Sequence, residues 1–229
     1  MAFYKPVFLP GKAGIIGAMP YPGFSFGLWE DNMTSSEGPV LPAGGFYFKS
    51  AYQTDKFESG LMAVYVELFQ AYRFKPITFL EIGIGQGGSI SFFQEYFKHP
   101  DAKIIGIDIR IPDFKKGENT TILNINQNDS KALETLAADY GPFDVILDDG
   151  AHFAKETQNC FDILFPYLKV GGSYIIEDWM AEYMGSEFKG MIDLVHDIGR
   201  SSMLRGIREY KIESNYRGSY AHFRKEKNI

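Results

Sequence analysis

The stretch that decides the fold is EIGIGQGGS, residues 81–89, which directly follows the apolar run at residues 77–80. Glycine at alternate positions lets the chain turn sharply and lets a ligand approach the backbone. The residues that follow have the apolar spacing of a helix, so backbone N–H groups are exposed at a helix start, where polar ligands bind. We therefore expect a strand, a ligand-binding turn and a helix in succession.

Beyond residue 57 the chain alternates short apolar runs with helical stretches. Helices are expected at Glu58–Tyr72, Ser89–Phe97, Ser130–Tyr140 and Ala154–Leu168. Strands are expected at Ile77–Ile82, Lys103–Ile107, Thr120–Ile125, Phe143–Leu147 and Ser173–Ile176, with an edge hairpin of Ile207–Ile212 and Ser219–Arg224. This alternation predicts an α/β fold with a doubly wound, mostly parallel seven-stranded sheet and an antiparallel C-terminal hairpin.

The first fifty residues differ from the rest, because they hold six of the eleven prolines together with many glycines and aromatic residues. Such a segment can neither propagate a helix nor alternate as a strand. We therefore divide the chain into an irregular N-terminal segment, residues 1–50, and a main domain, residues 51–229. The segment is either a wrap that packs on the domain or a lid over its site, and the two readings are not exclusive.

Charge and composition narrow the class of protein. The net charge of −6 argues against a nucleic-acid partner, which requires clustered Lys and Arg. The sequence shows neither a signal-peptide pattern nor an apolar run long enough to span a bilayer, so no membrane partner is expected. The single cysteine, Cys160, cannot form an intramolecular disulfide and is interpreted as a core residue. We expect a cytoplasmic protein, and the composition leaves open whether it forms a homo-oligomer.

Glu81, two residues before the first glycine, is informative, because NAD enzymes also place a glycine-rich turn here but do not require that acid. The E-x-G-x-G-x-G pattern resembles motif I of class I methyltransferases that use S-adenosylmethionine (SAM). The resemblance implies that SAM is the cofactor. It also implies that the amino-acid end of SAM is held by Glu81 and the turn residues Gly83, Gly85, Gly87 and Ser89.

Three further residues are assigned to cofactor binding. Asp108 ends the second strand, where a carboxylate can accept hydrogen bonds from both ribose hydroxyls. Gln127, after the third strand, could reach the adenine edge, whereas the nearby Asp129 could equally be a helix N-cap. Asp148, at the end of the fourth strand, completes the set of expected cofactor contacts.

Two acidic pairs follow apolar strands, Asp148-Asp149 and Glu177-Asp178, and His152 lies beside the first pair. Open α/β sheets build their sites at these strand ends. Carboxylates that converge there repel one another unless a cation lies between them, and oxygen ligands suit Mg²⁺. The alternative assigns each pair to loops and N-caps, but this explains two successive pairs and a histidine poorly.

Several motifs together carry a closer resemblance: DDGAH at 148–152, Thr157, FPYL at 165–168, GGSYIIED at 171–178 and TDK at 54–56. Their combination resembles the metal-dependent macrolide-sugar O-methyltransferases of the mycinamicin type and the cephalosporin-hydroxylase-like group. The resemblance implies that Asp149, Glu177 and Asp178 hold the metal and that His152 is the catalytic base. His152 could instead be a neutral neighbour of the metal ligands.

Together these patterns predict a SAM-dependent and Mg²⁺-dependent O-methyltransferase. The expected acceptor is a hydroxyl of a sugar or another small natural product, and a glycosylated one is the leading candidate. The glycine turn is shorter than in the macrolide enzymes and residues 1–50 resemble no segment of them, so the sequence leaves the acceptor's identity open. A hydroxylase-like enzyme and a non-catalytic SAM-binding protein of the same fold are the alternatives.

Overall fold

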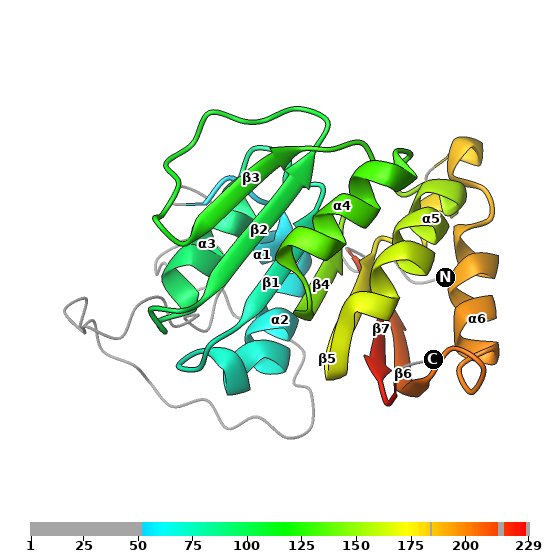
Figure 1. The fold of residues 1–229 in the computed structure, drawn as a ribbon. Coiled ribbons are helices and arrows are strands. Elements are labelled where there is room, and N and C mark those ends of the chain that lie inside the picture. Colours follow the sequence, from blue (N-terminus) through cyan, green and yellow to red (C-terminus); the bar gives the residue numbers. More distant parts are fainter. Residues whose placement is uncertain (1–51, 184, 215–217, 228–229) are drawn as a thin grey trace, which may run out of the picture. The chain divides into compact units, whose positions relative to one another are not determined.

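The computed structural model describes residues 52–183, 185–214 and 218–227. These residues form a seven-stranded sheet in the order β3-β2-β1-β4-β5-β7-β6 (Figure 1). The parallel strands are β1 (Thr78–Ile82), β2 (Lys103–Asp108), β3 (Thr120–Asn124), β4 (Phe143–Asp148) and β5 (Leu168–Glu177). Strand β7 (Ser219–Lys225) runs antiparallel both to β5 and to β6 (Ile207–Ser214). The expected doubly wound sheet and its C-terminal hairpin are confirmed. The predicted N-terminal segment lies outside the described residues.

Helices cover both faces of the sheet (Figure 1). One face packs against α1 (Lys56–Ser59), α2 (Leu61–Phe69) and α3 (Gly88–Tyr96), with the 3₁₀ turn η1 (Gln70–Tyr72) after α2. The other packs against α4 (Ser130–Tyr140), α5 (Ala154–Leu164) and α6 (Met191–Arg200). Three more 3₁₀ turns are η2 (Phe165–Tyr167), η3 (Ala181–Tyr183) and η4 (Ser186–Phe188). None of the helices in the described ranges is both long and apolar enough to cross a membrane.

Successive side chains of β1 contribute in turn to two hydrophobic cores, one on each face of the sheet. Phe79 faces the core beneath α2 and α3, where its ring lies 4.7 Å from that of Phe93, whereas Leu80 and Ile82 face the opposite core. Side chains alternate because successive residues of a strand point to opposite faces. Glu81 therefore points into the same layer as Phe79, towards α1 and α3 rather than towards solvent.

Some expected element boundaries were wrong, for identifiable reasons. The helix expected over Glu58–Tyr72 is divided at Gly60, whose φ of +82° is a left-handed conformation that ends α1. The helix expected to reach Leu168 ends at Leu164 as an α-helix, because Pro166 cannot continue it and a 3₁₀ turn follows. Strand β5 begins at Leu168, earlier than expected, and α6 was not predicted. Cys160 is buried in the core, as expected.

Candidate functional site

The glycine turn after β1 is held in one conformation from both sides. Gly83 has a φ of +79°, and a Cβ at this position would lie 2.2 Å from the carbonyl oxygen of Asp149, so only glycine fits. Asp108 Oδ2 accepts hydrogen bonds from the backbone N–H groups of Ile84 and Gly85, each at 3.1 Å. Asp108 therefore orders the turn as well as presenting a carboxylate at the end of β2.

A cleft of about 630 Å³ opens at the carboxyl ends of the parallel strands, beside the glycine turn. Its volume lies within the range of small-molecule sites. The predicted site residues that line it are Gly83, Gly85, Ser89, Asp108, Gln127, Asp149, His152 and Asp178. The others, Glu81, Gly87, Asp148 and Glu177, are buried behind this lining. The structure thus brings the predicted cofactor and metal residues to one place.

Glu81 is a buried carboxylate with one oxygen unsatisfied. Its Oε1 accepts a hydrogen bond of 2.6 Å from Ser89 Oγ, whereas Oε2 has no hydrogen-bond partner among the described residues. Burial raises the pKa of Glu81 to about 7. A buried acceptor without a donor is costly, and a positively charged amino group is the type of ligand that would satisfy it.

Gln127 and Asp148 form a buried pair in the wall of the cleft. Gln127 Nε2 lies 3.3 Å from Asp148 Oδ1, and Gln127 Oε1 accepts a hydrogen bond of 2.8 Å from the Ala151 N–H. The Tyr174 hydroxyl donates to Asp148 Oδ2 at 3.1 Å, and burial raises the pKa of Asp148 to about 7. Both side chains are therefore bonded within the protein, and their direct contact with a cofactor stays a prediction.

Asp129 has the structural role that the sequence left open. Its side chain accepts a hydrogen bond of 3.0 Å from the Ala132 N–H at the start of α4. It is therefore an N-cap.

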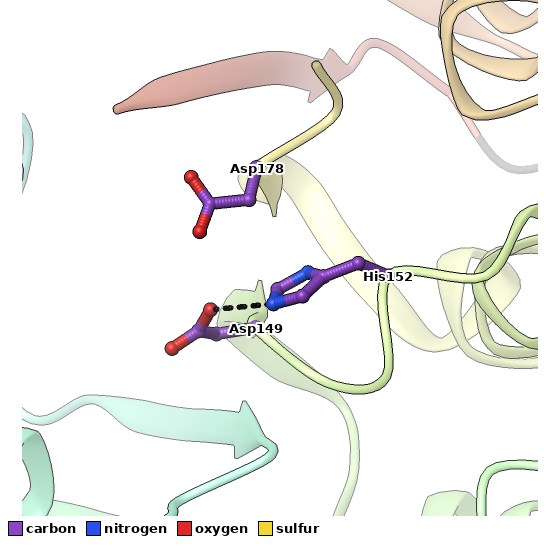
Figure 2. Close-up of side chains that lie close together, drawn as sticks. All are labelled: Asp149, His152 and Asp178. Carbon is purple, nitrogen blue, oxygen red and sulfur yellow. Dashed lines mark ion pairs between the residues drawn. The ribbon is translucent and has the colours of Figure 1, made fainter. Parts of the chain in front are cut away.

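The pairing of β4 with β5 brings the two acidic pairs together, because Asp148 lies opposite Ile176 in the parallel register. The carboxylates of Asp149 and Asp178 and the imidazole of His152 converge from these strand ends (Figure 2). One ligand atom from each lies within 4.8 Å of the others, and His152 Nε2 lies 3.7 Å from Asp149 Oδ1. This arrangement of two carboxylates and an imidazole can hold a divalent cation.

His152 and Asp178 both have left-handed backbones, with φ values of +56° and +50°. Residues other than glycine adopt this conformation at a cost of about 1–3 kcal/mol, and such strain clusters at functional sites. Asp178 is held there by its N–H, which donates to the Ser219 carbonyl at 2.8 Å. The left-handed backbone at each residue sets the direction in which its side chain leaves the backbone.

Lys56 is the site residue whose role the sequence did not reveal. Its ammonium, at the start of α1, lies 3.1 Å from Glu177 Oε1 and 4.0 Å from Glu81 Oε1, and it donates to Asp149 Oδ2. Burial lowers its pKa, but these carboxylates raise it more, so the pKa lies well above the usual range for lysine. We expected only a metal ion to balance the acidic pairs, and the structure places a lysine among them. The TDK motif contains Lys56, but no periodicity distinguishes a buried lysine from an exposed one.

The three carboxylates predicted to bind the metal differ in their surroundings, and Asp149 contacts Lys56 as well as lining the cleft. Glu177 is buried beside Lys56, and burial followed by the charge of Asp149 raises its pKa well above its usual value. Asp178 faces the cleft beside His152, and burial raises its pKa, opposed by His152. The predicted metal set of Asp149, Glu177 and Asp178 thus has its two cleft-facing members beside His152. Glu177 as a metal ligand stays a prediction.

The chain is similar in sequence to curated O-methyltransferases. Demethylmacrocin O-methyltransferase of Streptomyces fradiae is 38% identical over 125 residues, covering 51% of this chain and 31% of its own. Mycinamicin VI 2''-O-methyltransferase of Micromonospora griseorubida is 35% identical over 133 residues, which cover 55% of this chain and 32% of the relative. The aligned part of the chain spans about a third of the length of these curated relatives. No protein-family profile matches the chain.

A solved structure decides the fold. The MycE methyltransferase of the mycinamycin biosynthetic pathway, in complex with Mg, SAH and mycinamycin VI, superposes with a TM-score of 0.65 and 27% identity. The superposition covers 79% of this chain and 54% of MycE. The chain has the class I methyltransferase fold. The cleft lies at the carboxyl ends of the parallel strands. In this sheet the strand order reverses between the neighbouring strands β1 and β4, which is where such folds bind ligands.

Proposed function

We propose that this methyltransferase-fold chain binds SAM and a divalent cation such as Mg²⁺, and transfers the SAM methyl group to a hydroxyl of a small molecule. The observation that carries the proposal is the convergence of Asp149, His152 and Asp178 in the same cleft as the glycine turn. The relatives are O-methyltransferases, and another of them, 8-demethyl-8-(2-methoxy-alpha-L-rhamnosyl)-tetracenomycin-C 3'-O-methyltransferase of Streptomyces olivaceus, has a rhamnosyl group in the name of its substrate, which supports a glycosylated acceptor.

On the cofactor side, two carboxylates at strand ends would hold the amino-acid end and the ribose of SAM. Asp108 Oδ1 and Oδ2 already accept backbone hydrogen bonds from Arg110 and from the glycine turn. Oδ2 already accepts two of these hydrogen bonds, whereas Oδ1 accepts one and has a second acceptor position, at which it would bind a ribose hydroxyl. The unsatisfied Oε2 of Glu81 would stabilise the amino group of SAM.

On the metal side, Asp149 and Asp178 would hold the cation, with Glu177 as the predicted third carboxylate. The donor set fits the cation, because it is rich in oxygen and its burial disfavours uncompensated negative charge. A bound divalent cation would act as a Lewis acid that lowers the pKa of the acceptor hydroxyl.

His152 would move the proton. Its ring is 25% exposed in the cleft wall, and Nε2 lies 3.7 Å from Asp149 Oδ1. An imidazole suits this step because its pKa lies near neutral pH. The protein would therefore hold the acceptor oxygen in line with the methyl group and remove its proton.

The test is product analysis by mass spectrometry after incubation with methyl-labelled SAM, Mg²⁺ and a panel of glycosylated polyketides and free sugars. We expect the label on one acceptor hydroxyl and SAH as the second product. An acceptor that gains oxygen instead would support the hydroxylase-like alternative. Tight SAM binding with no transfer to any acceptor class would support the non-catalytic alternative.

A further inference from the structure

The side chain of Lys56 is buried at the floor of the proposed site, only 2% exposed. A desolvated ammonium is strongly unfavourable unless carboxylates or other acceptors surround it. Here the surroundings are the carboxylates of Glu81, Asp149 and Glu177. The lysine and these acids therefore depend on one another for their burial.

Asp149 divides its two oxygens between two partners. Oδ2 accepts from the Lys56 ammonium, whereas Oδ1 faces His152 in the cleft. A carboxylate whose one oxygen accepts a hydrogen bond from a fixed ammonium cannot rotate freely. Lys56 therefore fixes the direction of Asp149 Oδ1, the oxygen that would bind a cation. Glu177 is held by the same ammonium at 3.1 and 3.2 Å.

We propose that Lys56 is a positioning residue, a resident cation that keeps Asp149 and Glu177 converged when no divalent cation is bound. This inference rests on the proposed metal site. Its positive charge balances part of the acidic cluster in the metal-free protein and, by repulsion, weakens divalent-cation binding. The site would thus stay assembled without the metal and would exchange it readily.

The experiment compares Lys56→Met with Lys225→Met. Lys225 is a suitable control, because it is equally buried but its ammonium contacts the carbonyl oxygens of Phe165 and Pro166. Thermal unfolding is measured in EDTA and in Mg²⁺, and Mg²⁺ affinity is measured by calorimetry. The inference predicts that Lys56→Met loses Tm in EDTA, recovers most of the loss in Mg²⁺, and binds Mg²⁺ on the order of tenfold more tightly than the unsubstituted protein. Lys225→Met should show neither the recovery nor the affinity change.

Unchanged Mg²⁺ affinity in Lys56→Met, with equal loss of Tm in EDTA and in Mg²⁺, overturns the inference, because a merely structural lysine would behave in that way. If Lys56→Met does not fold in EDTA, the double variant Lys56→Met/Glu177→Gln provides the test. Removing both charges should restore folding. A double variant that remains unfolded contradicts charge balance as the role of Lys56.

The proposed metal site and the proposed role of Lys56 can be disproved separately. If the unsubstituted protein binds no Mg²⁺ in calorimetry, the proposed metal site is wrong. The comparison of the single and double variants in EDTA still tests Lys56 in that case, since it requires no metal. If Mg²⁺ binds equally to the unsubstituted protein and to Lys56→Met, the metal site stands and the role of Lys56 is wrong.

Discussion

Lys56 and Lys225 are equally buried, each 2% exposed, but they lie in opposite electrostatic surroundings. Lys56, at the carboxyl ends of the parallel strands, lies among three carboxylates that raise its pKa. Lys225, on the antiparallel strand β7 next to the edge of the sheet, donates to the carbonyl oxygens of Phe165 and Pro166, and burial lowers its pKa. The same degree of burial therefore accompanies two different functions of a lysine.

The difference extends to the neighbouring residues. At the strand ends, Glu81 keeps a buried oxygen without a hydrogen-bond partner among the described residues, and His152 and Asp178 are strained. At the antiparallel edge, the buried His222 pairs with the neutral Ser173 hydroxyl at 2.8 Å. Under the proposed function the charged groups at the strand ends bind ligands, whereas those at the antiparallel edge pair within the protein. Substitutions in the first region should change binding and catalysis, and those in the second should change only the free energy of unfolding.

The largest effect is expected for His152→Ala. Loss of the general base should lower kcat by roughly 10²–10⁴-fold, while the affinities for Mg²⁺ and SAM stay close to those of the unsubstituted protein. Steady-state kinetics and calorimetry measure the two properties separately, with His99→Ala as the control because His99 pairs with the exposed Asp101. A parallel loss of Mg²⁺ affinity would instead make His152 a metal ligand.

Asp108→Ala should act on the cofactor. It removes the acceptor proposed for the ribose and releases the N–H groups of Ile84 and Gly85, so SAM binding should weaken by about 2–3 kcal/mol. Calorimetry with SAM measures this, and the exposed Asp113 in the following loop provides a matched Asp→Ala control. Unchanged SAM affinity in Asp108→Ala contradicts the assignment.

His222 should make stability depend on pH without affecting the site. Burial, and then Arg224, lower its pKa from 6.5 to about 4. Because the folded-state pKa lies below the unfolded value, His222 contributes stability above pH 6.5 that is lost as the pH falls through about 4. Between pH 7 and 4 the protein should lose about 3 kcal/mol relative to His222→Gln in urea unfolding. Parallel pH profiles for the two proteins would show that His222 is not buried in its neutral form.

The smallest effect is expected for Lys225→Met. The substitution leaves the Pro166 carbonyl without its ammonium donor, which should cost about 1 kcal/mol of stability. Urea unfolding with and without Mg²⁺ should give the same loss. A loss that Mg²⁺ reverses would break the distinction between the two regions.

The sequence predicted the sheet and placed the candidate site residues at its strand ends, because both follow from local patterns. The apolar runs around Leu80 and Ile146 specify parallel strands, and the glycines and acids directly follow those runs. It did not predict the relation of Lys56 to Glu177, which are far apart in the sequence and meet only once α1 packs over the strand ends. Likewise, nothing in the sequence indicates the left-handed backbone of His152, which depends on the loop after β4.

The most direct test of the central claim is methyl transfer by chelator-stripped enzyme, measured with labelled SAM on the acceptor that the screen identifies. The proposed mechanism predicts that EDTA abolishes transfer, that Mg²⁺ restores it, and that Asp149→Asn stays inactive in Mg²⁺. SAM affinity should remain unchanged in all three cases, because the main contacts proposed for the cofactor lie at the ends of β1, β2 and β3. Full activity in excess EDTA, or an active Asp149→Asn, would contradict a metal-dependent reaction at this site.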